Sequence, residues 1–375
     1  MPQSNLINNA SFINGEWLYS SDTFAVINPF DDSIVANVSN AGIIETEQAI
    51  RSAKNALKAW SSKSANERSL FMRKWFDLVI SHQDELAKIL TLEQGKPLTE
   101  AKGEIAYGAS FIEWFAEEGK RIYGDTIQSP GNDKRIVVLK QPVGVVAAIT
   151  PWNFPNAMIA RKAAAALAAG CTFVVRPASL TPLSALALAE LAQQAGIPDG
   201  VFNVVVGTDS RAIGKVLTTH SDIAKFTFTG STHVGKSLIK QCASTVKKVS
   251  MELGGNAPFI VFDDADIDAA VQGAIVSKYR NAGQTCVCTN RILVHESILD
   301  EFTEKFVKAV TALKVGNGLD NDVNIGPMIS TTALDDVNQL VNESIDAGAR
   351  LLTGGKSEEG RCFYLPSVLT DVTND

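Results

Sequence analysis

Residues 143–177, VGVVAAITPWNFPNAMIARKAAAALAAGCTFVVRP, decide the fold class of this chain. They begin with an apolar, β-branched run at 143–149, which predicts a buried strand. The prolines that follow predict a loop, and the Ala-rich residues 157–169 predict a helix that stops at Gly170. Residues 172–175 predict the next strand. A strand, a helix and a strand in this order indicate a βαβ unit with two parallel strands.

The same alternation continues on both sides of this stretch. Upstream, apolar residues at helical spacing predict two helices, at 45–60 and 65–91. Downstream, the pattern predicts helices at 183–195 and 231–244 and strands at 202–206 and 223–229. We therefore expect an α/β fold whose parallel sheet is covered by helices on both faces.

One segment breaks the alternation. Residues 122–127 and 134–139 are two β-rich runs, and the residues between them, QSPGND, are typical of a turn. This pattern predicts a β-hairpin rather than a βαβ unit. A hairpin inserted between α/β units can project as an arm or lie on the surface as a flap, and the residues alone leave both open.

Composition excludes several classes of function. The 375 residues are 45% hydrophobic and 20% charged, which is typical of a globular protein of about two domains. The formal charge is −7, which disfavours nucleic acid and anionic lipid as partners. Five cysteines are too few for a disulfide scaffold, and four scattered histidines offer no metal site. We expect no metal, no nucleic acid and no membrane.

The sequence shows no targeting or membrane-spanning pattern. Residues 1–10 lack the basic start and apolar core of a signal peptide. Residues 141–160 carry no charge but hold three prolines and two asparagines, which disfavour a membrane span. We expect a cytoplasmic protein.

Two segments could carry chemistry. Cys286 follows the small, polar loop RNAGQT, where a thiol can be exposed, although most isolated cysteines are core residues. Cys288 lies two residues further on, but no second Cys or His pair stands at the spacing of zinc ligands. Glu252 precedes a double glycine and is either an exposed strand-end residue or a general base.

A third segment could bind an anion. Gly230 and Ser231 open a predicted helix that also contains Gly235, so backbone N–H groups and the helix dipole are available there. The pattern matches neither a P-loop nor GxGxxG, and it is weak by itself.

Five motifs in a fixed order carry a family resemblance: PWNFP at 151–155, RPAS at 176–179, FTGS at 228–231, ELGG at 252–255 and GQTC at 283–286. With FINGEW at 12–17 and IGP at 325–327, the chain resembles the aldehyde dehydrogenase superfamily over essentially its whole length. The segment FIEWFAEEGKRIYGDT at 111–126, Arg161 and the CVC at 286–288 are most similar to the NADP-dependent succinate-semialdehyde dehydrogenases of that superfamily.

The resemblance implies a fold and an activity. The fold would combine a Rossmann-type nucleotide domain (1–121 and 141–252), a hairpin for oligomerisation (122–140) and a catalytic α/β domain (253–375). Cys286 would attack the aldehyde, Asn153 and the Cys286 backbone N–H would hold the oxyanion, and Glu252 would activate water.

The resemblance also places the cofactor. The expected contacts are Thr150, Pro151, Trp152, Asn153, Arg176, Pro177, Ala178, Ser179, Gly207, Gly230, Ser231, Gly235 and Leu253. Arg176 stands where most members carry a lysine, and Ser179 where NAD-preferring members often carry a glutamate. A serine does not repel a 2′-phosphate and an arginine binds one, which favours NADP, with NAD accepted as a second choice. The alternative interpretation is that Arg176 does not contact the cofactor and is a salt-bridged surface residue.

The implied substrate is succinate semialdehyde, a small molecule whose carboxylate Arg161 and Arg280 would bind. The alternative substrate is another ω-carboxylated aldehyde such as glutarate semialdehyde. The resemblance further suggests Cys286 and Cys288 as a redox switch, against a simple packing role for Cys288.

The chain ends before the family's Glu-Glu-x-Phe-Gly-Pro motif and its C-terminal segment. The resemblance therefore implies a C-terminally truncated catalytic domain. It implies a homo-oligomer for a complete chain and makes one doubtful for this chain. An impaired remnant that only binds nucleotide or a full-length relative is the competing hypothesis from a different class.

Overall fold

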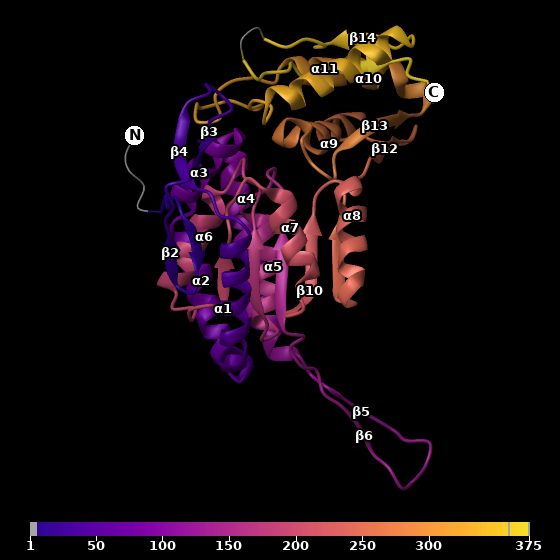
Figure 1. The fold of residues 1–375 in the computed structure, drawn as a ribbon. Helices are drawn as coiled ribbons and strands as arrows, with labels where there is room; N and C mark the ends of the chain where they lie inside the picture. The colour runs from indigo at the N-terminus through magenta and orange to yellow at the C-terminus, as the bar shows by residue number, and fades with distance from the viewer. Residues whose placement is uncertain (1–5, 359–360, 374–375) are drawn as a thin grey trace. The chain divides into compact units, whose positions relative to one another are not determined.

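The computed structural model describes residues 6–358 and 361–373, so predictions about residues 1–5 and 374–375 lie outside the described residues. The chain divides into two compact units (Figure 1). Unit 1 comprises residues 1–26, 36–86 and 103–252, and unit 2 comprises residues 27–35, 87–102 and 253–375.

A seven-stranded sheet forms the centre of unit 1, in the order β11-β10-β7-β8-β9-β1-β2. The five strands from β11 to β9 in this order pair in parallel. Beyond β9, strand β1 pairs antiparallel with β9, and β2 pairs antiparallel with β1. The bounds are β1 Ser11–Ile13, β2 Glu16–Leu18, β7 Val145–Ile149, β8 Thr172–Arg176, β9 Phe202–Val204, β10 Ile223–Thr229 and β11 Lys248–Glu252. Every residue of β7 and β8 is buried, as parallel strands covered on both faces require.

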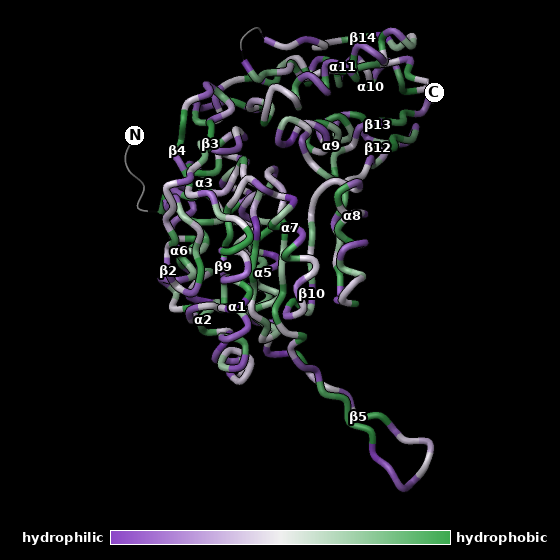
Figure 2. Tube along the Cα trace, viewed as in Figure 1, coloured by the Kyte–Doolittle hydropathy of each residue, from purple (hydrophilic) through white to green (hydrophobic). Residues whose placement is uncertain are grey.

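Helices cover both faces of this sheet (Figure 1). One layer holds α5 and α6 with α2 behind them, and the other holds α1 and α7, with α8 beside α7. The bounds are α1 Ile43–Ser61, α2 Ala65–Ser81, α5 Ala157–Ala168, α6 Leu183–Gln194, α7 Ser210–Thr219 and α8 Thr232–Cys242. Figure 2 shows hydrophobic residues along the strands, with hydrophilic residues on the outer helices.

The predicted helix at 65–91 is two helices, α2 and α3 (Gln83–Gln94), because the chain breaks at His82. The His82 imidazole Nδ1 lies 2.9 Å from the Leu78 carbonyl oxygen, which also accepts the His82 N–H at 3.1 Å, so His82 caps the end of α2. Apolar spacing continues across the break, so periodicity could not reveal it. The other predicted helices and strands agree with the structure to within a few residues at each end.

The predicted hairpin is present as β5 (Asp125–Ile127) and β6 (Ile136–Val138), which pair antiparallel. It projects from unit 1 as an arm (Figure 1), and Figure 2 shows hydrophobic strands with a hydrophilic tip. Its apolar side chains are exposed, among them Ile127, Val137 and Leu139. Of the two alternatives that the sequence left open, a projecting arm and a surface flap, the hairpin is therefore the arm.

Unit 2 contains a parallel pair, β12 (Ala257–Val261) and β13 (Thr289–Val294). Helices α9 (Ile267–Tyr279) and α10 (Leu299–Thr311) pack on this pair around a core that includes Val261, Phe302 and Phe306. The chain continues through α11 (Thr331–Asp346) and an antiparallel pair, β14 (Arg350–Thr353) and β15 (Val368–Thr370).

Two N-terminal segments belong to unit 2, although we predicted all of 1–121 in the nucleotide domain. These are residues 27–35 and 87–102, which take in parts of β3 (Thr23–Ile27), β4 (Ile34–Ser39), α3 and α4 (Leu98–Glu118). The reason is close packing at Gly95, whose φ is +93°, where an added Cβ would lie 2.7 Å from Pro327 and 2.9 Å from Pro29. Contacts between residues so far apart in sequence leave no local pattern.

No helix among residues 6–358 and 361–373 is long and apolar enough to cross a membrane. The uncharged residues 141–160 form β7, a loop and the start of α5.

Candidate active site

The carboxyl ends of four parallel strands lie along one edge of the unit 1 sheet. Thr150 follows β7, while Arg176, Thr229 and Glu252 end β8, β10 and β11. The chain runs from β7 to β8 and β9 on one side and then returns to β10 on the other. The sheet therefore has its topological switch point beside β7, and ligands of open α/β sheets bind at this point.

Three of these residues leave buried polar atoms without partners. The Thr150 hydroxyl, the Thr229 hydroxyl and the Arg176 Nε make no hydrogen bond within the described residues, although each residue is at least 93% buried. Buried polar groups are nearly always hydrogen-bonded, so three unpaired groups at one sheet edge indicate an incomplete polar site.

The Arg176 side chain is buried at the end of β8 and bonds to a backbone carbonyl. Its Nη2 donates to the Gly207 carbonyl oxygen at 3.0 Å, and burial lowers its pKa to about 10. This buried guanidinium is not the salt-bridged surface arginine of the alternative interpretation. Gly207 fits there because a Cβ would lie 2.0 Å from the Ala41 carbonyl oxygen.

The N-terminus of α8 faces the same edge. The Ser231 hydroxyl accepts a hydrogen bond from the Val234 N–H at 3.3 Å, and the Gly230 N–H donates to the Glu252 carbonyl oxygen at 3.1 Å. A Cβ on Gly230 would lie 2.4 Å from the Phe228 ring, and Gly235 is buried in the first turn of α8. The predicted anion turn is therefore a real helix N-terminus beside the unpaired groups.

The loops after β7 and β8 supply the remaining predicted cofactor residues of unit 1. Pro151, Trp152 and Asn153 are half-buried, and the Trp152 carbonyl oxygen accepts from the Thr181 hydroxyl at 3.3 Å. In the second loop, Pro177 is buried and Ala178 and Ser179 are half-buried. The unpaired Nε of Arg176, two unpaired hydroxyls and a helix N-terminus fit a phosphate-bearing nucleotide.

Two cations lie on α5 next to this edge. The Arg161 guanidinium lies 5.0 Å from the centroid of the Phe111 ring. The Lys162 Nζ donates to the Thr227 hydroxyl at 2.9 Å. The pKa of Lys162 is lowered to about 8, chiefly by burial and also by Arg161 and Lys225, while Glu252 acts in the opposite direction.

The predicted thiol stands in unit 2. Cys286 is exposed, and Cys288, the second thiol of the pair, is buried. The Cys288 Sγ donates to the Lys278 carbonyl oxygen at 3.2 Å, and both cysteines are free. Arg280 is exposed at the start of the same loop, and Leu253 is half-buried at the start of the last segment of unit 2.

The structure thus brings the predicted residues together in two groups. Asn153, Glu252, Arg161 and the nucleotide residues other than Leu253 belong to unit 1, while Cys286, Cys288 and Arg280 belong to unit 2. No group of three or more His, Cys, Asp or Glu side chains within the described chain is placed to hold a metal ion.

Sequence reasoning missed Lys162 and Glu104. Glu104 on α4 is buried and accepts from the Asn156 and Ala157 N–H groups, at 3.0 and 3.2 Å, at the start of α5. A carboxylate is favourable at a helix N-terminus. The signal available for Lys162 was its place, next to Arg161, in a helix whose other residues are apolar and mostly Ala.

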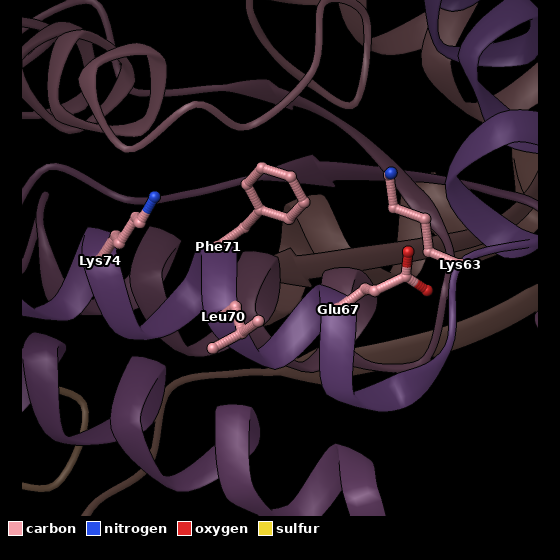
Figure 3. Close-up of a pocket in the computed structure, with 5 residues that line it drawn as sticks. All are labelled: Lys63, Glu67, Leu70, Phe71 and Lys74. Carbon is pink, nitrogen blue, oxygen red and sulfur yellow. The ribbon is translucent and has the colours of Figure 1, made fainter.

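A surface pocket on α2 lies among residues with no predicted role (Figure 3). Glu67 accepts from the Ser64 N–H and hydroxyl there, which lowers its pKa, and Lys63 Nζ lies 5.5 Å from the Phe71 ring centroid. The Glu67 carboxylate therefore caps the N-terminus of α2, and this structural role accounts for its lowered pKa. The pocket is lined by Lys63, Glu67, Leu70, Phe71 and Lys74.

The parallel sheet and the unpaired polar groups at its edge define a Rossmann-type α/β protein. The model of the aldehyde dehydrogenase family matches residues 17–375, and the chain belongs to this family. The resemblance read from the motifs is confirmed.

Several relatives are similar over nearly the whole chain. The NADP-dependent succinate-semialdehyde dehydrogenase of Escherichia coli is 57% identical over 98% of this chain and 77% of its own length. A glutarate-semialdehyde dehydrogenase of Pseudomonas putida is 55% identical over 99% of this chain and 78% of its own. The chain spans about three quarters of the length of these relatives.

Solved structures confirm the fold. A crystal structure of succinate-semialdehyde dehydrogenase from Burkholderia pseudomallei matches with a TM-score of 0.98 and 55% identity, over 100% of this chain and 78% of that one. A crystal structure of an E. coli NADP-dependent enzyme matches with a TM-score of 0.98 and 56% identity, over 99% and 78%.

Proposed function

We propose that this chain oxidises succinate semialdehyde to succinate with NADP as the oxidant. The observation that carries the proposal is the similarity to relatives named for this reaction, at 57% identity over 98% of the chain. The intact set of Cys286, Glu252 and Asn153 supports it.

The chemistry follows from the side chains. The Cys286 thiolate adds to the aldehyde carbon and forms a thiohemiacetal whose oxyanion the Asn153 amide and the Cys286 backbone N–H stabilise. The nucleotide, held by the unit 1 residues named below, would supply the acceptor for the hydride that this carbon loses. Glu252 then takes a proton from the water that attacks the resulting thioester, and the acid leaves as the Cys286 thiol is restored.

The nucleotide is proposed to lie on the unit 1 sheet edge. Gly230, Ser231 and the α8 N-terminus would hold the pyrophosphate, and Thr150, Trp152, Gly207 and Leu253 would line the nucleotide. The buried guanidinium of Arg176 and the neutral Ser179 would receive the 2′-phosphate, which supports NADP over NAD.

The alternative substrates share one feature with succinate semialdehyde. Relatives are named for glutarate semialdehyde and for 3-sulfolactaldehyde, which also carry an anionic group distant from the aldehyde. We propose Arg161 and Arg280 as the anion-binding pair, which fits all three and leaves chain length open.

Replacing Arg161 by Ala should raise KM for succinate semialdehyde about 10-fold or more, because a charge-assisted bond contributes ~1.5–3 kcal/mol. The measurement is kcat/KM for succinate semialdehyde and for hexanal, which has no carboxylate. Arg211→Ala, at an exposed arginine of α7, is the matched control. An unchanged ratio of the two substrates in the Arg161 variant would show that Arg161 does not bind the carboxylate.

NADPH formation by the 375-residue chain tests the proposal as a whole. Turnover of succinate semialdehyde supports the enzyme. Binding of NADP without any turnover supports the competing hypothesis, a remnant that binds nucleotide or a full-length relative. A cytoplasmic location is also part of the proposal, although plant and rodent relatives are named as mitochondrial. Homo-oligomer formation through the exposed arm is proposed for a complete chain, not for these 375 residues alone.

We also propose that Cys286 and Cys288 form a reversible disulfide. Peroxide would take two electrons and two protons from the thiols and become two waters. Cys288 must first leave the Lys278 carbonyl, so the loop has to rearrange. Mild peroxide should abolish activity and dithiothreitol should restore it in the parent chain. Cys288→Ala should keep most of its turnover but should lose the part of the inactivation that dithiothreitol reverses. If dithiothreitol restores Cys288→Ala as it restores the parent, Cys288 is a packing residue.

Lys162 should make stability depend on pH. Its pKa falls from 10.5 in the unfolded chain to about 8 in the folded one, so between these values the unfolded state binds more protons and stability rises with pH. Below pH 8 the buried charge costs about 3 kcal/mol. Lys162→Met should therefore raise the free energy of unfolding at pH 7 by roughly 2 kcal/mol, after about 1 kcal/mol for the lost bond to Thr227.

Urea unfolding of the parent and of Lys162→Met at pH 7 and pH 10 measures this difference. The gain should shrink at pH 10, where Lys162 is neutral in the folded parent. A variant that is less stable at both pH values would show that burial of this ammonium carries no such cost.

A further inference from the structure

Asn281, five residues before Cys286, has every polar group hydrogen-bonded inside unit 2. It is 2% exposed. Its N–H donates to a Glu100 carboxylate oxygen at 2.8 Å, and its side-chain oxygen accepts from the Gln94 amide at 2.9 Å. Its side-chain nitrogen donates to the Gln284 carbonyl oxygen at 3.3 Å. Its carbonyl oxygen accepts from the Gln284 amide side chain at 3.1 Å and from the Gln284 N–H at 3.0 Å.

These bonds surround a rare backbone path. Asn281, Ala282 and Gly283 have φ values of 55°, 55° and 77°, so three consecutive residues are left-handed. Asn and Gly tolerate this region, but Ala does not, and such a run persists only where its surroundings impose it. The path reverses the chain between α9 and the segment that carries Cys286.

The network is tied to the unit on both sides of the loop. Gln94 ends α3, and its amide oxygen accepts from the Lys96 N–H at 3.1 Å. Glu100 lies in the first turn of α4. Gln284, on the far side of the turn, accepts from the Ile329 N–H at 3.0 Å. Asn281 is the residue that joins these anchors.

We infer that Asn281 is the positioning residue of the thiol loop: its hydrogen bonds to Gln94, Glu100 and Gln284 hold the left-handed turn that turns Cys286 outward and keeps Cys288 buried. The inference rests on the proposed function only in taking Cys286 as the nucleophile. It concerns loop geometry, so it can be tested without turnover.

Thiol labelling of the whole 375-residue chain reads this geometry directly. Cys286 is the one exposed thiol among the described residues, and Cys171, Cys242, Cys288 and Cys362 are buried. Iodoacetamide labelling followed by peptide mass mapping should modify Cys286 rapidly in the parent. In Asn281→Ala, Cys288 should be labelled about 10-fold faster or more, while the other three buried thiols stay protected, because a local opening exposes only its own segment.

A second variant and a matched control separate positioning from general loss of stability. Asn281→Gly relaxes the backbone but removes the same side-chain bonds, so it should behave like Asn281→Ala. Asn203 is a fully buried asparagine of unit 1 that bonds to Asn14, Phe173 and Gly200. Asn203→Ala should destabilise its unit without selective labelling of Cys288.

Kinetics supply a further readout. Both Asn281 variants should lower kcat about 10-fold or more with little change in KM, because misplacing the reacting atom costs rate rather than affinity. Cys288 protection that stays unchanged in both variants, or all four buried thiols labelled together in both, would overturn the inference. A failure of the proposed function would give a different result. Turnover would survive in Cys286→Ser, while the parent and the two Asn281 variants would still show the expected labelling of Cys288.

Discussion

Cys286→Ser should lower kcat/KM for succinate semialdehyde by about 10³-fold or more, because a hydroxyl is a far weaker nucleophile than a thiolate at neutral pH. The structure leaves Cys286 exposed on the loop after α9, where an aldehyde can reach it. Steady-state NADPH formation measures the loss, and NADP binding should be unchanged, since the proposed nucleotide residues lie in unit 1 except for Leu253.

Cys362→Ser is the matched control for this variant. Cys362 belongs to the same unit but is 7% exposed, and burial raises the pKa of its thiol. It should keep its turnover. A Cys286→Ser chain with parental activity, or an inactive Cys362→Ser chain that is still folded, would place the nucleophile elsewhere.

The parts of this molecule that the sequence predicted are those with local patterns. The strand and helix of residues 143–177 appear as expected, and the strand ends bring Thr150, Arg176 and Glu252 to one edge because parallel strands point the same way. Ordered motifs identified the family correctly.

The parts that it missed depend on distant partners. Gln94 and Glu100 meet Asn281 across 187 and 181 residues, and the left-handed turn has no recognisable pattern in RNAG, where Asn and Gly tolerate it but Ala does not. Residues 27–35 and 87–102 join unit 2 through packing at Gly95. The low pKa of Lys162 comes from burial and from two neighbouring cations, which the order of residues cannot show.

Glu252→Gln should separate the two halves of the reaction. Glu252 is exposed at the end of β11, and its carbonyl oxygen accepts the Gly230 N–H, so the amide replacement keeps the backbone contact. Without a carboxylate to take a proton from water, the thioester should persist. General-base removal of this kind costs about 10²–10⁴-fold in steady-state kcat.

The first turnover should survive this change, since Cys286 and Asn153 act before the water step. Rapid mixing should therefore show a burst of about one NADPH per chain followed by a slow phase, the signature of an accumulated acyl-enzyme. Glu47→Gln, at a half-buried glutamate on α1 whose ion pair with Arg51 spans 3.8 Å, should show parental kinetics. If the burst disappears and single-turnover rates fall as much as kcat, Glu252 acts on the thiol or on hydride transfer instead. The base for the thioester would then have to be sought among other groups near the sheet edge, with Lys162, whose pKa is about 8, as the first to test.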